Sequence, residues 1–124
     1  MRYAALLILC LGSAAQAEGA RQVFDCTITQ RCGASGACGS GRDPVVFTLD
    51  PEEVDADGAG SYRIGWDEAA APMQAGSSLG PFTWAEGDRR HTLLFSSETN
   101  MLWHDLDLSR GEASVAFLTC EVIR

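Results

Sequence analysis

The 124-residue sequence predicts an all-β fold, a small antiparallel meander that closes into a barrel or sandwich and is tied by two disulfides. Three observations predict this fold class. Segments in which apolar and polar residues alternate recur roughly every ten to fifteen residues and are joined by short polar turns. No segment has a sustained helical period. The first and last alternating segments each carry a cysteine on the apolar face.

The start of the chain has the features of a cleaved secretory signal. Arg2 supplies a positive charge, the run from Ala4 to Leu11 is apolar, and Ala15-Gln16-Ala17 forms a small-x-small cleavage site. We therefore expect residues 1–17 to be removed and residues 18–124 to form a single all-β domain. The expected location is periplasmic or secreted.

Two membrane-bound alternatives are less favoured. The apolar run is about ten residues long, whereas a membrane-spanning helix needs about 20. Cys10 is a poor site for lipid attachment because Leu9, which is not small, precedes it, and because it lies inside the apolar run. No stable membrane insertion is expected once the signal is removed.

The expected mature chain is strongly acidic. Without residues 1–17 it has eight arginines, no lysine and 17 Asp and Glu residues, a formal charge of −9 with histidine neutral. Such a chain has no basic cluster that could displace counterions from nucleic acid or anionic lipid. The charge balance instead favours a cationic periplasmic or extracellular protein as the partner.

Four cysteines remain in the expected mature chain, and disulfides are the default interpretation for an even number in an exported protein. The intervals between them are five, five and 81 residues. Zinc sites usually contain pairs two to four residues apart, and thioredoxin-like redox centres contain Cys-x-x-Cys, so both are less favoured. The cysteines are Cys26, Cys32, Cys38 and Cys120.

Three disulfide pairings are possible, and the strand pattern ranks them. Cys26 and Cys120 both lie on apolar faces, so they can bond if the first and last strands are neighbours. Cys32 and Cys38 would then close a glycine-rich loop. Closure of the meander would place the first and last strands side by side, which is what the Cys26–Cys120 pairing requires, so the two inferences support each other.

Three strands are predicted in the first half of the mature chain. They cover residues 23–29, residues 43–50, which stop at Pro51, and residues 61–66. Their apolar faces carry Phe24, Cys26 and Ile28; Val45, Phe47 and Leu49; and Tyr62, Ile64 and Trp66.

Residues 67–80 have no clear period, and Pro72 and Gly76 interrupt them. We predict a long loop or a short irregular edge strand here.

The second half of the chain predicts four more strands. Residues 81–86 and 90–97 form a hairpin around a Glu-Gly-Asp turn, and residues 101–109 and 113–123 form the last two strands. The expected apolar faces include Phe82 and Trp84 in the hairpin, and Ala116, Leu118, Cys120 and Val122 in the last strand.

The acidic stretch of residues 50–58 is predicted to be a solvated turn. Aligned on Gly58, an EF-hand loop would place its twelfth ligand at Ile64, where a bidentate Glu is required, and no helix flanks the segment. A looser calcium site is the less favoured alternative, and no metal or cofactor is expected.

His104 lies close in sequence to two carboxylates, Asp105 and Asp107. On a strand, His104 shares a face with three leucines, whereas Asp105 and Asp107 lie on the opposite face with Trp103. One histidine cannot share a site with carboxylates on the other face. We predict that His104 is hydrogen-bonded at the edge of the core and is not a metal ligand or a general base.

No catalytic motif is recognisable in the chain. His91 stands beside Arg89 and Arg90, where turn solvation explains all three. None of the four paired serines lies in a Gly-x-Ser-x-Gly motif. The sequence therefore predicts a protein that is not an enzyme, although residues that assemble only in space are invisible at this level.

The chain resembles the periplasmic C-type lysozyme inhibitor family, which are small disulfide-tied β-barrels. The resemblance is carried by Cys26, the Gly58–Tyr62 segment, the Trp84–Asp88 segment and Cys120. In that family, a serine and a lysine in the corresponding two segments are thought to enter the lysozyme cleft. The approximately matching positions here hold Asp57 and Glu86.

These observations predict a non-catalytic binding or inhibitory module. The candidate partner-binding residues are Asp57, Tyr62, Trp84 and Glu86. The alternatives are a small-ligand-binding or enzymatic barrel whose mouth is lined by tryptophans, with His104 as a further lining residue, and a structural component of the envelope.

Overall fold

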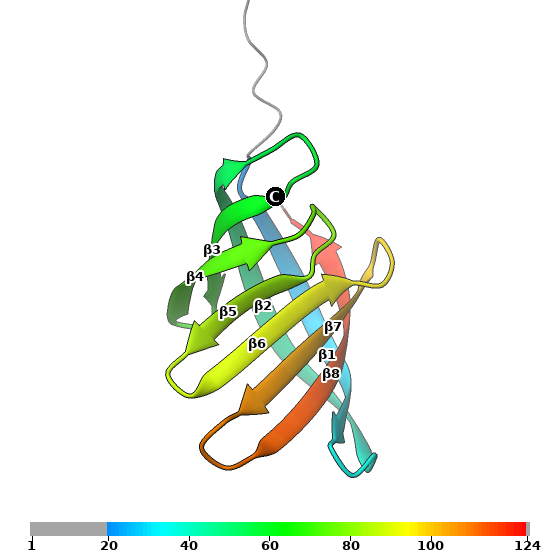
Figure 1. Ribbon diagram of the computed structural model, residues 1–124. Helices are drawn as coiled ribbons and strands as arrows, with labels where there is room; N and C mark the ends of the chain where they lie inside the picture. The colour runs from blue at the N-terminus through cyan, green and yellow to red at the C-terminus, as the bar shows by residue number, and fades with distance from the viewer. Residues whose placement is uncertain (1–19, 124) are drawn as a thin grey trace, which may run out of the picture.

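The computed structural model describes residues 20–123, which form one closed barrel of eight antiparallel strands (Figure 1). Each strand pairs with the next, and the last pairs with the first, so the predicted fold class is confirmed as a barrel. No helix in the described part of the chain is long and apolar enough to cross a membrane. The strands are β1 (Gln22–Gly33), β2 (Cys38–Val54), β3 (Gly60–Trp66), β4 (Ala69–Ala75), β5 (Phe82–Glu86), β6 (Arg89–Phe95), β7 (Asn100–Asp107) and β8 (Glu112–Val122). The predicted signal segment, residues 1–17, lies outside the described residues.

The meander gives the barrel two distinct ends. The upper end in Figure 1 holds the start of β1, the end of β8, and the β2–β3, β4–β5 and β6–β7 loops. The lower end holds the turns of the other four hairpins. The tip of the β1–β2 hairpin lies beside the β7–β8 turn, because β1 pairs with β8 as far as Gly33 and Ser114. The first half of β2 pairs with β1 alone, since β2 pairs with β3 only from Phe47 to Val54.

Both predicted disulfides are present. Cys26 bonds Cys120, and the two residues are direct cross-strand partners between β1 and β8. Cys32 bonds Cys38 across the tip of the β1–β2 hairpin. The first bond therefore fastens the closing strand pair of the barrel, and the second closes only a local hairpin. Two disulfides indicate an oxidising, exported environment.

Packed side chains fill the barrel interior. Inward positions alternate along every strand, and the buried apolar side chains form one continuous cluster. β4 contributes mainly alanines, and Trp66 and Trp84 are cross-strand partners of Ala69 and Met73 on this strand. Ala69 leaves room for the Trp66 ring beside it, whereas Met73 is fully buried beside Trp84. The largest fully buried side chains are Phe47, Leu49, Ile64, Met73, Phe82, Leu93 and Met101.

The structure corrects three expectations about strand boundaries. β1 continues past residue 29 to Gly33, and β2 begins at Cys38 and not at residue 43, so both strands reach the Cys32–Cys38 disulfide. β2 does not stop at Pro51 but continues to Val54, with a register shift between Pro51 and Glu53 that accommodates the missing N–H. Residues 69–75, expected as a loop or an edge strand, form β4 and pair on both sides. Pro72 lies in the part of β4 that has no β5 partner, so its lack of an N–H interrupts no β4–β5 ladder.

Candidate functional site

The lower end of the barrel is plugged by three tryptophans and a histidine. The imidazole of His91 stacks on Trp84 with ring centroids 4.9 Å apart and an angle of 16° between the planes. Trp66 and Trp103 flank the imidazole with centroid distances of 5.7 Å and 5.8 Å. His91 is only 4% exposed, so this layer of rings closes the interior from below.

One hydrogen bond fixes the protonation state of His91. The Trp103 indole Nε1–H donates to His91 Nδ1 over 3.1 Å, so Nδ1 must be unprotonated and the proton of the neutral ring lies on Nε2. Nε2 lies 3.9 Å from Glu86 Oε1 and has no hydrogen-bond partner among the described residues. Burial lowers the pKa of His91. The charges of Asp105 and Glu86 oppose this shift, and Arg89 reinforces it.

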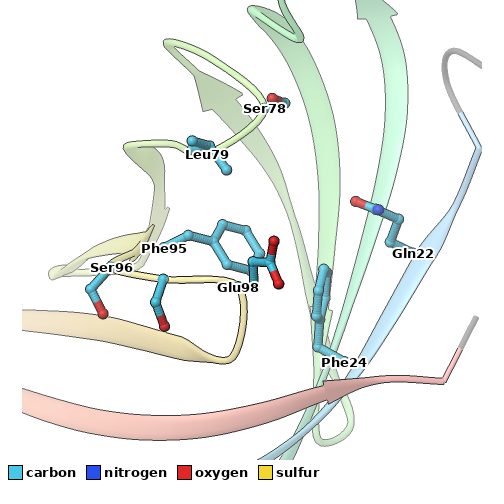
Figure 2. Close-up of a pocket in the computed structure, with 8 residues that line it drawn as sticks. Gln22, Phe24, Ser78, Leu79, Phe95, Ser96 and Glu98 are labelled. Carbon is cyan, nitrogen blue, oxygen red and sulfur yellow. The ribbon is translucent and has the colours of Figure 1, made fainter.

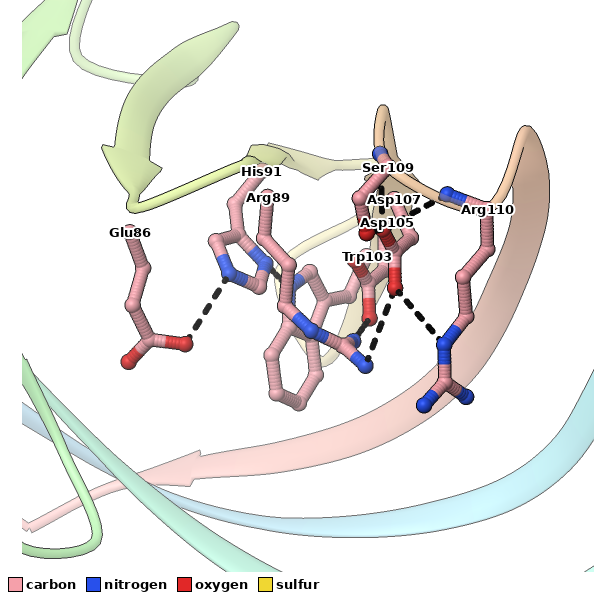
Figure 3. A network of polar contacts seen from close by, with 8 residues as sticks. All are labelled: Glu86, Arg89, His91, Trp103, Asp105, Asp107, Ser109 and Arg110. Atoms are coloured by element: carbon pink, nitrogen blue, oxygen red, sulfur yellow. Dashed lines mark hydrogen bonds and ion pairs between the residues drawn. The ribbon is translucent and has the colours of Figure 1, made fainter.

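A network of charged residues covers the aromatic layer (Figure 3). Arg89 binds the carboxylate of Asp105, and its second amino group lies 3.8 Å from Asp107 Oδ2. The hydroxyl of Ser109 donates to Asp107 Oδ1 over 2.7 Å. This hydrogen bond is the main cause of the lowered pKa of Asp107, with backbone N–H groups and Arg89 adding to it and burial opposing it. The lower mouth is thus closed by ion pairs between its own residues.

The upper end is hollow. A pocket of about 460 Å³ opens there, and we call it the upper hollow. Its floor is formed by Phe24 and Phe95, whose ring centroids are 5.2 Å apart, and Leu79 forms part of its rim (Figure 2). The complete lining comprises Gln22, Phe24, Ser78, Leu79, Phe95, Ser96, Ser97 and Glu98.

The β4–β5 loop that presents Leu79 is held by hydrogen bonds on both sides. The Ser78 N–H donates to the Asp57 carbonyl in the β2–β3 loop over 2.9 Å, and the Phe95 N–H donates to the Leu79 carbonyl over 3.0 Å. Within the loop, the Ser77 hydroxyl donates to the Gly80 carbonyl over 2.8 Å. The side chain of Leu79 nevertheless remains 64% exposed. An apolar residue is therefore held in solvent by an ordered backbone.

The four candidate partner-binding residues do not form one surface. Tyr62 and Trp84 are buried in the barrel interior. Asp57 is exposed in the β2–β3 loop at the upper end, and Glu86 is exposed at the end of β5, at the lower end. The two positions matched by the resemblance thus lie at opposite ends of the barrel.

The tryptophans expected at a ligand-binding mouth do not line the upper hollow. Trp84 and Trp103 belong to the lower plug. Trp66 also forms part of the wall of a separate surface hollow of about 340 Å³ between β2 and β3, together with Val46 and Asp67.

The prediction for His104 is wrong, and the buried histidine is the other one. β7 turns Met101, Trp103 and Asp107 inward, so His104 is exposed and is not at the edge of the core. The reason is that Trp103 packs its ring edge-on against Phe47, with centroids 5.2 Å apart, while the outward leucines near the end of β7 can remain in solvent. His91, expected in a solvated turn, could have been found from its alternation with Leu93 on β6.

The prediction of a turn for residues 50–58 is confirmed only in part: residues 50–54 belong to β2, and residues 55–58 form a turn held by its own side chain. Asp55 Oδ1 accepts the N–H groups of Asp57 and Ala59 over 2.9 Å and 3.0 Å. Within residues 20–123, no group of three or more His, Cys, Asp or Glu side chains is placed to hold a metal ion. The Asp55 carboxylate therefore has a structural role in ordering the loop.

No protein-family model, curated protein or solved structure matches this chain.

Proposed function

We propose that the protein is a non-catalytic binding or inhibitory module of an oxidising space outside the cytoplasm, and that its partner is a cationic protein. The observation that carries this proposal is the filled barrel interior. Since packed side chains occupy the space where ligand-carrying barrels hold their cargo, recognition is left to the surface and the loops at the two ends.

The charge of the chain supports the choice of partner. A domain with a formal charge of −9 attracts cationic proteins at low salt and repels acidic ones. Glu86 supplies exposed negative charge at the lower end, because its side chain is 47% exposed and the imidazole of His91, 3.9 Å away, has a lowered pKa. A C-type lysozyme is the first partner to test, on the strength of the sequence resemblance.

The alternative of a ligand-carrying barrel with a tryptophan-lined mouth has less support. Trp66 and Trp84 are buried against each other and against His91, so they do not form an open mouth.

Titration of the disulfide-bonded protein into a C-type lysozyme at ~0.15 M salt tests the proposal, with calorimetry for binding and cell-wall lysis for inhibition. We expect saturable binding that weakens as salt rises, and slower lysis. An acidic protein of similar size is the control and should not bind. The absence of both binding and slowed lysis would remove lysozyme inhibition as the function.

Glu86→Gln is the variant that tests the position identified by the resemblance. If Glu86 contacts the cationic partner, removal of its charge should weaken binding by about two- to fivefold, the range of an exposed ion pair. Asp88→Asn, in the adjacent turn, is a matched control that removes a neighbouring negative charge. Equal losses in both variants would indicate a general charge effect and no specific contact at Glu86.

A further inference from the structure

We propose that the upper hollow binds a small amphipathic cation, a ligand with an apolar aromatic or branched aliphatic body and one protonated amine. This site is distinct from the surface contact proposed above and does not depend on a protein partner. Its volume of about 460 Å³ lies within the range of small-molecule sites, roughly 300 to 1,000 Å³.

The floor and rim of the hollow select an apolar body. Phe24 and Phe95 present aromatic surface at the bottom, and Leu79 adds an aliphatic side chain at the edge. Because hydrogen bonds already order the loop that carries Leu79, a ligand would not have to order it on binding. The exposure of Leu79 in the free protein leaves apolar area that a ligand can cover.

Glu98 selects a positive charge. Among residues 20–123, it is the only charged residue that lines the hollow. In Figure 2 its carboxylate points into the space beside the Phe95 ring, on the side of Phe24. The structure shows no hydrogen bond or ion pair between this carboxylate and another residue in the range 20–123. It contrasts with Asp55 in the neighbouring loop, whose carboxylate is used by two backbone N–H groups.

The turn that carries Glu98 is itself ordered. The Ser97 hydroxyl oxygen accepts the N–H of Asn100 over 3.1 Å, and the Ser96 N–H donates to the Asn100 carbonyl over 3.0 Å. On the following residue, the Thr99 carbonyl accepts the Cys120 N–H from β8. The negative charge is therefore presented from a fixed turn opposite the fixed Leu79 loop, and a ligand that combines an apolar body with an amine fits between them.

Three probes that share one body and differ in charge test the proposal. They are 4-phenylbutylammonium, the neutral 4-phenylbutanol and the anionic 4-phenylbutanoate, each titrated into ¹⁵N-labelled protein at neutral pH. We expect saturable amide shifts at Ser78, Leu79, Phe95 and Glu98, with affinity falling from the ammonium to the alcohol to the carboxylate. A dissociation constant on the order of a millimolar is expected for ligands of this size.

Two variants separate the charge from the apolar contact. Glu98→Gln should weaken the ammonium by about two- to fivefold and leave the alcohol unchanged. Leu79→Ser lies in an exposed position, so the fold should tolerate it, and it should weaken all three probes. Glu86→Gln at the lower end is the charge-matched control and should change none of the affinities.

Several results would overturn the proposal. Equal affinity for the three probes, or no change of the ammonium affinity in Glu98→Gln, would remove the cation selectivity. Shifts confined to the lower end, or no saturable shift, would remove the site. A wild-type protein that elutes as a dimer, with Leu79→Ser eluting as a monomer, would mean that a second copy covers Leu79 and no small ligand does. Lysozyme takes no part in these measurements, so this inference and the proposed function can fail separately.

Discussion

The two ends of the barrel share one wall but close in different ways. At the lower end, the rings of Trp66, Trp84 and Trp103 pack around the buried imidazole of His91. At the upper end, Phe24 and Phe95 form the floor of an open pocket that the β4–β5 and β6–β7 loops border. One end is therefore plugged by rings that pack on one another, whereas the rings at the other end form the floor of a hollow.

The two ends also differ in whether their charged and apolar side chains are already paired within the protein or are exposed to solvent. At the lower end, Arg89 is paired with Asp105 and Asp107, so these charges are largely satisfied within the protein. At the upper end, the Glu98 carboxylate and the Leu79 side chain face solvent. Charged groups that are already paired within a protein form few further interactions with a ligand. Exposed groups on an ordered loop remain free to bind one. We therefore expect substitutions of the buried rings and paired charges at the lower end to change stability, and substitutions around the upper hollow to change binding of the small cation.

Removal of the disulfides should give the largest effects. The Cys26–Cys120 bond spans a sequence separation of 94 and fastens the wall common to both ends, whereas the Cys32–Cys38 bond spans six. Loop-closure entropy predicts losses of about 4 to 5 kcal/mol for the Cys26→Ala/Cys120→Ala variant and about 2 kcal/mol for the Cys32→Ala/Cys38→Ala variant. Guanidinium unfolding followed by circular dichroism measures both free energies of unfolding.

The comparison of the two double variants is the critical result. If the short bond contributed as much as the long one, loop-closure entropy would not be the main source of the stabilisation by these disulfides. Peptide mapping without reduction provides the control, since it must recover the same two pairings from the wild-type protein.

The contrast between the ends is tested directly by one alanine substitution at each. Trp84→Ala removes a ring that packs on Trp66 and His91, and should cost about 3 to 5 kcal/mol of stability. Leu79→Ala at the exposed rim of the upper hollow should change stability by no more than about 0.5 kcal/mol. Should Trp84→Ala fail to fold, Trp84→Phe, which retains one stacked ring, gives a measurable intermediate loss. Similar costs for Trp84→Ala and Leu79→Ala would contradict the division between the ends.

Much of the fold could be predicted from the sequence because the alternation of apolar residues and the pairing of the cysteines both indicate which side chains point into the barrel. Period-two patterns placed Phe24 and Cys26 inward on β1 and Leu118 and Cys120 inward on β8, and the structure confirms all four. Once both end strands were known to direct a cysteine inward, only their adjacency remained to be inferred. A closed meander supplies that adjacency.

The remaining features depend on contacts that alternation does not record. β4 is hard to recognise because its inward residues are mainly alanines, which are small enough to accommodate the rings of neighbouring strands. On β7 both faces contain apolar residues, and the choice between them is made by the contacts of Trp103 with Phe47 and His91. The upper hollow is formed by loops far apart in sequence, so neither its volume nor the position of Glu98 could be derived from local pattern.

The smallest expected effect is a dependence of stability on pH that originates at the lower end. Burial holds the folded-state pKa of His91 below 6.5, while in the unfolded chain it returns to about 6.5. Between these two pKa values the unfolded chain binds a proton that the folded protein excludes. The free energy of unfolding should therefore fall as pH falls below about 6.5, and this loss should stop below the folded-state pKa.

Urea unfolding between pH 8 and pH 5, followed by tryptophan fluorescence, measures this dependence. Asp107 also has a lowered pKa, but its contribution to stability is lost only as pH falls below 3.8, so this contribution lies outside the measured range.

His91→Phe retains a ring beside Trp84, although it leaves the Trp103 N–H unpaired. This variant should flatten the pH dependence while lowering stability at every pH. His104→Phe, at the exposed histidine, is the matched control and should keep the wild-type slope. If His91→Phe and the wild-type protein had the same slope, the lower plug would not be the source of the response. The amide shifts of Leu79 and Phe95 should stay constant over the same range, because no histidine lines the upper hollow.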